Sequence, residues 1–266
     1  PIMPLRRLML PARLEALLLD VSTSPSIDDG ALEESERIAL KAVVDGLRVA
    51  RAGVWMFEAD RQAIRCRKLV DSIHPDEGEE ITLDRATYPR YFAALDTERA
   101  VVADDARSDP KTSEFTEGYL KPLGITAMLD VPIRQHGRMM GIICAEHVGP
   151  ARAWSSEEAA FAAAVADLLG RSVTAYRARL KAQKFTTSAL DHSHRILAET
   201  TAADADLAEM TAELGRLRST AGTDSAGSID ALAGIADRLR AHVEAAQRGA
   251  VGLESAVNTF RDVPKR

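Results

Sequence analysis

The spacing of hydrophobic positions predicts helices at the start of the chain and a β-hairpin after them. Apolar residues recur at helical spacing over residues 12–21 and 28–49. Residues 52–60 and 63–71 instead alternate apolar and polar side chains and are rich in β-forming residues. Because only a short polar turn separates these two segments, they are expected to pair as antiparallel strands.

Strands and helices continue to alternate after this hairpin. A short helix is expected after Pro89, and a strand at 99–105. The next segment predicts a helix that begins near Pro110 and is ended by Pro122 and Gly124. Proline favours the first turn of a helix and glycine its end, which is the reason for these bounds.

A second hairpin and a further helix complete this region. TAMLDVPIRQ at 126–135 and MMGIICAEHV at 139–148 flank a short turn and predict two more strands. Ser155 and Glu158 then have the Ser-x-x-Glu spacing of a capping box, which opens a helix. The order of elements therefore predicts an α+β fold built on an antiparallel sheet with flanking helices.

A heptad pattern replaces the strand pattern beyond residue 175. Steps of three and four residues connect the positions Ile196, Thr200, Ala203, Leu207, Met210, Leu214 and Leu217. After a glycine-containing segment, the same steps connect Ile229, Leu232, Ala236, Leu239, Val243, Ala246, Ala250, Leu253, Val257 and Phe260. Such a repeat specifies a coiled-coil seam. We therefore expect 173–266 to form an all-α coiled-coil hairpin of two helices of about thirty residues each, with a hinge at 219–228.

Charge and cysteine content narrow the classes of function. The net charge of −6 argues against a nucleic-acid partner, because binding to phosphates needs a basic face. Cys66 and Cys144 are too few for a disulfide framework, so a cytoplasmic protein is expected. No stretch approaches the roughly 18 apolar residues of a membrane span, so no membrane partner is expected either.

The spacing of Cys144 and His147 raises the question of a metal site. Positions three apart in a strand point to opposite faces, so these side chains cannot share one metal unless the strand ends between them. Zinc would also need two further ligands, and the sequence has no second cysteine or histidine cluster nearby. We therefore expect no metal and no cofactor, and interpret Cys144 as a small core residue.

The segment 123–169 carries a resemblance to a known family. Its characteristic elements are LDVPI, the hairpin glycines Gly137 and Gly141, AEHVGPAR, and then Trp154 with SSEE opening the helix. In this order they resemble the final hairpin and helix of a GAF domain, the small-molecule sensing module of phytochromes, phosphodiesterases and bacterial sensor kinases.

Two earlier motifs extend the resemblance to roughly 12–172. YPRYFAAL at 88–95 and ADDARSDPKTSEF at 103–115 look like the middle of GAF domains in sensor kinases and diguanylate cyclases. The resemblance implies a GAF-like sheet of about six antiparallel strands, with helices on one face and a ligand pocket on the other. It makes 12–172 a GAF-like sensory domain and 173–266 a helical signalling and dimerisation hairpin.

The resemblance also implies which residues line the pocket. By position, it places there Tyr88, Tyr91, Phe92, Asp105, Phe115, Tyr119 and Asp130. Asp130 is the most informative of them, because an acid between Leu129 and Val131 in a strand is either a ligand contact or a residue at a sheet edge or facing solvent. The aromatic residues belong either to the pocket or to the core beside it.

The resemblance does not imply a bilin chromophore. Bilin-binding GAF domains attach the chromophore through a cysteine in a loop or helix beside a histidine, or through one upstream of the domain. Cys144 lies in the last predicted strand and Cys66 in an early one, and neither has that setting.

Two histidines in LDHSHRIL support an alternative function. In sensor kinases a GAF domain is often followed by a dimeric helical hairpin with a phosphorylated histidine, and His192 and His194 lie near the start of the predicted hairpin. The seam places Ser193 and Ile196 inward, so His192 flanks it and His194 points outward. The acidic residue and proline that usually follow such a histidine are missing, and no nucleotide-binding motif follows. The alternative is a histidine phosphotransfer or sensor-kinase-derived dimerisation protein.

The sequence therefore favours a sensory or regulatory protein of the cytoplasm that is not an enzyme, since no nucleophile–base constellation or metal motif is visible. Its GAF domain would bind an unknown small molecule or a partner. The hairpin at 173–266 would form a homodimer and pass the signal to a downstream signalling protein. A purely structural adaptor with an empty, closed pocket is the third class of function to consider.

Overall fold

The computed structural model describes residues 10–73, 81–220 and 222–261. The chain divides into two compact units that meet between Arg179 and Leu180. None of the helices in the described ranges is long and apolar enough to cross a membrane.

The first unit opens with three helices and continues with a six-stranded sheet. The helices are α1 (Ala12–Ser22), α2 (Pro25–Asp29) and α3 (Leu32–Leu47). The strands are β1 (Arg51–Phe57), β2 (Ala63–Asp71), β3 (Thr82–Asp84), β4 (Val101–Ala103), β5 (Ile125–Gln135) and β6 (Arg138–Val148). Their order in the sheet is β3-β2-β1-β6-β5-β4, and every pair is antiparallel. The predicted α+β fold on an antiparallel sheet is confirmed.

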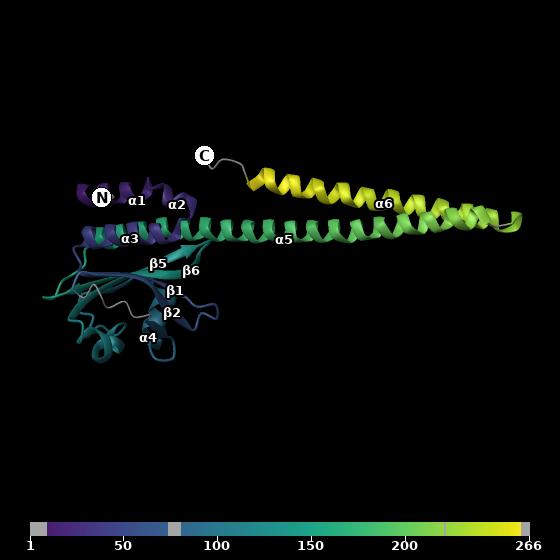
Figure 1. Cartoon of the computed structure of the whole chain (residues 1–266). Helices are drawn as coiled ribbons and strands as arrows, with labels where there is room; N and C mark the ends of the chain where they lie inside the picture. Colours follow the sequence, from purple (N-terminus) through teal and green to yellow (C-terminus); the bar gives the residue numbers. More distant parts are fainter. Residues whose placement is uncertain (1–9, 74–80, 221, 262–266) are drawn as a thin grey trace, which may run out of the picture. The chain divides into compact units, whose positions relative to one another are not determined.

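Each face of the sheet has its own hydrophobic core, because the strand residues alternate in direction. Leu129 and Val131 of β5 pack into one core with residues of α1, α3 and α5 (Ser156–Thr220). Met128 of β5 and Cys144 of β6 pack into the other core with α4 (Pro89–Thr97). Figure 1 shows α3 and the start of α5 along one face of the sheet and α4 on the other.

Two predicted helices differ from the observed elements. The helix expected over 28–49 begins at Leu32, because Gly30 ends the short α2 in the left-handed conformation, with a φ of 62°. The helix expected from Pro110 is a 3₁₀ turn, η1 (Ser113–Phe115), followed by a turn of π-helix, η2 (Thr116–Leu120).

Threonine side chains explain why this second segment is irregular. The hydroxyl of Thr112 donates to the carbonyl oxygen of Ala106 at 2.7 Å, and that of Thr116 donates to the carbonyl oxygen of Arg107 at 2.9 Å. Such side-chain bonds compete with a regular helix for backbone groups and tie the segment to the loop before it. The segment therefore packs as two short irregular turns on the same face of the sheet as α4.

Helix α5 begins with the predicted capping box and packs closely on the sheet. The backbone N–H of Ser155 donates to Glu158 Oε2 at 3.0 Å, and the N–H of Glu158 donates to Ser155 Oγ at 3.1 Å. A Cβ at Gly170 of α5 would lie 2.4 Å from the carbonyl oxygen of Arg134 in β5. The helix can approach the strand this closely only because residue 170 has no side chain.

The second unit consists of the rest of α5 and of α6 (Thr223–Arg261), paired as an antiparallel hairpin. The hydroxyl of Ser193 donates to the carbonyl oxygen of Ala250 at 2.8 Å, and Arg218 pairs with Asp230 near the turn at 3.1 Å. The second helix is longer than the expected thirty residues, since α6 has 39, and the first is the C-terminal part of α5, which has 65 residues in all. The break is also shorter than the expected hinge at 219–228.

The hairpin buries only part of the predicted seam. The buried positions are Leu207, Leu214, Ile229, Ala236 and Ala250. Several positions between them are exposed, among them Met210, Leu217, Leu232, Leu239 and Leu253. The side chain of Phe260 lies outside the described residues. Each helix therefore has one apolar row against its partner helix and a second apolar row that is exposed within a single chain.

The close approach of α5 to β5 can be tested with two alanine substitutions in the same helix. Gly170→Ala should destabilise the first unit by about 1–3 kcal/mol, because the new methyl group meets backbone that cannot turn aside. Gly215→Ala is the control, since a methyl group at that position would have no atom within 4 Å and alanine favours the helix by about 1 kcal/mol. Urea unfolding followed by circular dichroism measures both, and equal stability of Gly170→Ala and the unmutated protein would contradict the packing.

Candidate functional site

A small cavity of about 10 Å³ lies on the α4 side of the sheet. Four aromatic side chains and two carboxyl groups take part in its lining, together with apolar residues and one thiol. The lining residues are Trp55, Leu83, Tyr91, Phe115, Tyr119, Met128, Asp130, Ile142, Cys144 and Glu146. A space of this size holds about one water molecule.

Asp130 is the most unusual residue of this cavity, because it is fully buried and only one of its two carboxyl oxygens has a hydrogen-bond partner among the described residues. It lies in β5, whose neighbours β4 and β6 place Val101 and Cys144 beside it. Its exposed fraction is 0%, so the interpretation as an edge or solvent-facing residue is wrong. The hydroxyl of Tyr91 donates to Asp130 Oδ2 at 2.6 Å, whereas Oδ1 has no hydrogen-bond partner among the described residues.

The surroundings of Asp130 favour its protonated form. Burial raises the pKa of this carboxyl to about 8, and the negative charge of Glu146 adds to the rise, while the hydrogen bond from Tyr91 opposes it. Burial and the neighbouring Asp130 in turn raise the pKa of Tyr91 well above its usual value. The pair therefore carries no charge at neutral pH.

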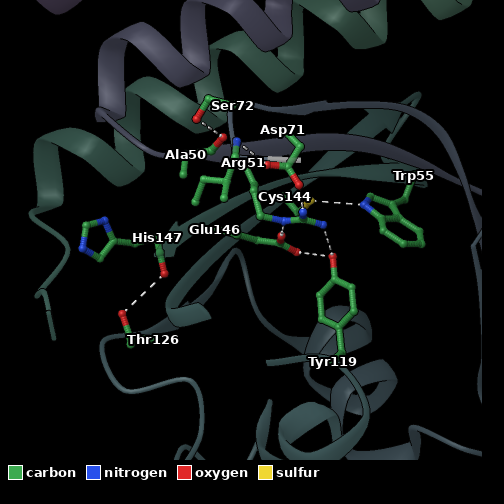
Figure 2. A network of polar contacts seen from close by, with 11 residues as sticks. Ala50, Arg51, Trp55, Asp71, Ser72, Tyr119, Thr126, Cys144, Glu146 and His147 are labelled. Atoms are coloured by element: carbon green, nitrogen blue, oxygen red, sulfur yellow. Dashed lines mark hydrogen bonds and ion pairs between the residues drawn. The ribbon is translucent and has the colours of Figure 1, made fainter. Parts of the chain in front are cut away.

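A buried ion-pair network borders the cavity, and Figure 2 shows it centred on Arg51 of β1. The guanidinium donates to Glu146 Oε2 at 2.8 Å, and it also pairs with Asp71 of β2. The hydroxyl of Tyr119 donates to Glu146 Oε1 at 2.9 Å and accepts from Arg51 Nη2 at 3.3 Å. The network joins β1, β2, β6 and η2, and its mutual bonds offset the cost of burying these charges.

The two thiols do not form a reactive or metal-binding centre. Trp55 Nε1 donates to Cys144 Sγ at 3.1 Å, and burial raises the pKa of Cys144 well above its usual value. Burial also raises the pKa of Cys66 to about 11. Figure 2 shows the His147 ring away from Cys144, and its Nε2 lies 3.1 Å from the carbonyl oxygen of Pro150. Over the described ranges, no three residues of metal-ligating type are grouped.

The structure brings four of the seven predicted pocket residues to the cavity: Tyr91, Phe115, Tyr119 and Asp130. Tyr88 packs on Phe115, with ring centroids 4.4 Å apart, without lining the cavity. Phe92 is buried in the core beside it. Asp105 does not line the cavity.

Asp105 lies on an exposed turn and holds that turn together. Its carboxylate accepts hydrogen bonds from the hydroxyl of Ser108 at 2.6 Å and from the backbone N–H of Arg107 at 3.2 Å. The hydroxyl bond lowers the pKa of Asp105 below its usual value. An aspartate that starts a turn accepts hydrogen bonds from residues two and three positions later in the chain. Its carboxylate therefore needs no ligand or distant partner, and its position in the sequence does not indicate a pocket.

Sequence reasoning missed Arg51, Trp55, Cys144 and Glu146 as parts of the site. For Glu146 a signal was present, because it is an acid in a mostly apolar strand, just as Asp130 is. Since it lies two positions from Cys144, both side chains point to the same face. For Arg51 no local signal exists, because its partners lie 20 and 95 positions away in the chain.

The two histidines of the alternative function lie on the second unit. Ser193 between them is fully buried, whereas His192 and His194 are exposed, as the heptad pattern predicts. His194 Nε2 lies 3.4 Å from Glu254 Oε1, and Arg195 lies 2.8 Å from His192 Nδ1.

Burial of Asp130 predicts an unusual pH dependence of stability. The folded protein holds the Asp130 proton more tightly than the unfolded chain, whose pKa is about 4, so this residue destabilises the fold increasingly as the pH rises from about 4 to about 8. Asp130→Asn should remove this loss, and the variant should therefore gain stability relative to the unmutated protein as the pH rises. Urea unfolding at a series of pH values measures the difference, and a difference independent of pH would contradict the buried neutral acid.

The fold has known relatives among solved structures. The Stigmatella aurantiaca phytochrome photosensory core module matches with a TM-score of 0.52 at 14% identity, over 68% of this chain and 41% of that one. The GAF domain of an Acinetobacter phosphoenolpyruvate-protein phosphotransferase matches with a TM-score of 0.49 at 14% identity, over 62% and 93%. The corresponding Coxiella burnetii domain gives 0.48 at 15% identity, over 63% and 94%. At these identities the likeness concerns the fold alone.

The sequence itself identifies the family. No curated protein matches it significantly. The model of the GAF domain family, however, matches residues 32–173, which include α3, the complete sheet and the part of α5 that packs on it. The matched region covers more than half of the chain and contains the cavity with Asp130 and the Arg51 network. The chain therefore belongs to the GAF domain family.

Proposed function

We propose that this chain is a sensory or regulatory protein whose GAF domain binds a small ligand in the Asp130 cavity and passes the change through the helical hairpin. The observation that supports this most strongly is Asp130 Oδ1, a fully buried polar atom without a protein partner among the described residues that borders a cavity. Leaving such an atom unpaired costs about 1–3 kcal/mol. A ligand that pairs with it would recover this free energy.

The segment η2, which contributes Tyr119 to the cavity wall, is the part of the wall that we expect to move when a ligand enters. Tyr119 closes one side, and it belongs to η2, a turn of π-helix. Such turns are rare and occur frequently at functional sites. Because the cavity holds only about one water molecule, a larger ligand would need the side chain of Tyr119 to move, which would break its bonds to Arg51 and Glu146.

Strand β5 links the cavity to helix α5. Asp130 points to the cavity, whereas its neighbours Leu129 and Val131 point into the core that contains α5. The carbonyl oxygen of Arg134 in the same strand lies against Gly170 of that helix. A shift of β5 on ligand binding would therefore press directly on α5, which continues without a break to Thr220 in the hairpin.

The exposed apolar row of the hairpin supports a homodimer as the output state. Met210, Leu217, Leu232, Leu239 and Leu253 continue the heptad pattern, although they are exposed in one chain. Two hairpins packed through these rows would form a four-helix bundle, which also covers Ile235 and Val251. A bundle of this kind can present a ligand-dependent surface to a downstream signalling protein.

The chemistry of the cavity favours a regulatory function over a catalytic one. The thiol of Cys144 and the phenols of Tyr91 and Tyr119 all have raised pKa values, with burial as the main cause, so they are protonated at neutral pH. Protonated thiols and phenols are poor nucleophiles and poor bases. We therefore expect binding at this site without turnover.

A thermal-shift screen tests ligand binding by the full chain. At least one small molecule from a mixed panel of amines, nucleotides, amino acids and organic acids should raise the melting temperature of the unmutated protein, following RT ln(1 + [L]/Kd). The same compound should not stabilise Asp130→Ala. Asp105→Ala is the matched control, because Asp105 lies on an exposed turn, and it should respond like the unmutated protein. A panel without any stabilising compound would favour a structural adaptor.

Aspartate substitutions test the dimer. Leu239→Asp with Leu253→Asp should give monomers, because the introduced charges would be buried between the two hairpins, while the sheet domain stays folded. Ala231→Asp with Ala245→Asp adds the same charge at exposed positions of α6 outside the apolar row and should leave the dimer intact. Sedimentation velocity separates the two outcomes. A dimer that survives the leucine substitutions must form through another surface.

A further inference from the structure

The two carboxyl groups that line the cavity differ in their partners, since Glu146 is paired with Arg51 and Asp130 is not. Among the described residues, the Arg51 guanidinium is the single cation in the buried cluster around these groups, and the carboxyl groups of Asp71, Glu146 and Asp130 are its acids. Asp71 and Glu146 are both paired with Arg51, so the guanidinium is already shared between two carboxylates. Asp130 has no cation beside it and is bonded only to the Tyr91 hydroxyl. Among the described residues, Asp130 is therefore the acid of the cavity that has no cation to pair with when it ionises.

The walls of the cavity favour a cation as the missing charge. Four aromatic side chains, those of Trp55, Tyr91, Phe115 and Tyr119, line it beside the carboxyl groups. Aromatic rings attract cations through their quadrupole, and a cation already uses one of these rings, since Arg51 Cζ lies 5.9 Å from the centroid of the Tyr119 ring. An anion would instead face the Glu146 carboxylate in a buried site, where like charges repel strongly.

We propose that the cavity binds the charged head of a small protonated amine, either the ammonium ion or a primary alkylammonium group, with Asp130 Oδ1 as its counter-ion. This inference rests on the proposed ligand-binding function and names the chemical class of the ligand. The cavity of about 10 Å³ has room for one non-hydrogen atom of the size of an ammonium nitrogen. A short alkyl substituent would enter only when the Tyr119 side chain moves, and it would then lie against the apolar side chains of Leu83, Met128 and Ile142. A quaternary ammonium is too large for the head site and cannot donate a hydrogen bond to Oδ1.

Binding of the amine is coupled to loss of a proton. The pKa of Asp130 is about 8 without a cation, so at lower pH the amine must displace the carboxyl proton, which leaves to solvent as the ammonium pairs with the carboxylate. The groups that face Asp130 are Tyr91 of α4, Cys144 and Glu146 of β6, and, across the cavity, Tyr119 of η2. The phenols and the thiol stay neutral in this range, since burial raises each pKa. Affinity should therefore fall about fivefold from pH 8 to pH 7 and about tenfold per pH unit below pH ~7.

Thermal-shift titrations of the full chain with simple amines test the inference. Ammonium, methylammonium and ethylammonium chloride serve as probes, at chloride concentrations matched with sodium chloride. Tetramethylammonium chloride is the control for cationic charge without N–H donors, and acetamide is the neutral control. The proteins are the unmutated chain, Asp130→Asn and Asp105→Asn, the last of which removes an exposed carboxylate in the same way.

The expected result is a rise in melting temperature with a primary amine for the unmutated chain and Asp105→Asn, and none for Asp130→Asn. The two control compounds should give no rise. For the stabilising amine, calorimetry in buffers of different ionisation enthalpy should show proton release at pH 7, with about fivefold tighter binding at pH 8 than at pH 7. Equal responses of the unmutated chain and Asp130→Asn, or stabilisation that does not depend on pH, would overturn the inference.

The failure of this inference is distinguishable from a failure of the proposed function. If the amines have no effect but a neutral or anionic compound stabilises the protein only when Asp130 is present, the cavity is a ligand site and the assigned ligand class is wrong. If neither the amines nor any other compound stabilises the protein, both the ligand class and the sensory function are wrong, and the cavity holds a structural water only.

Discussion

The burial of charged and acidic groups inside the sheet domain is the constraint on which the rest of this structure depends. The sheet is covered on both faces, so any charge on β1, β5 or β6 that points away from the helices α3 and α5 must be satisfied beneath α4 and η2. Arg51 meets this demand for Asp71 and Glu146 and draws the Tyr119 hydroxyl into the same network. Asp130 has no cation beside it among the described residues, and its carboxyl group is therefore protonated.

The two faces of the sheet therefore differ in the kind of side chains that they bury. The face under α3 and α5 is an apolar core in which even a methyl group at Gly170 would clash, so helix and strand are closely packed there. The other face holds aromatic rings, an ion-pair network and an unsatisfied carboxyl around a cavity. This difference between the faces supports the proposed function, in which ligand binding on one side would displace the helix packed on the other.

The sequence indicates elements formed by local periodicity better than contacts between distant segments. The antiparallel sheet, the capping box at Ser155 and the inward position of Ser193 follow from periods of 2, 3.6 and 3.5 residues, and the structure confirms them. Asp130 could be singled out because an acid between apolar strand residues is conspicuous. The Arg51 network could not be predicted, because its partners come from strands far apart in the chain. Asp105 lies outside the cavity, and its position could not be predicted because a turn-forming aspartate looks the same in sequence as a ligand-binding one.

The central claim of this account is that Asp130 is a buried neutral acid in the protein alone and ionises when a cationic ligand binds beside it. Carbon-13 NMR of the labelled aspartate carboxyl groups, with Asp130 assigned by its absence in Asp130→Asn, observes this group directly. The account predicts that Asp130 titrates near pH 8 in the protein alone and at a lower pH when methylammonium is added. A titration near pH 4, the value of an exposed aspartate, would contradict it.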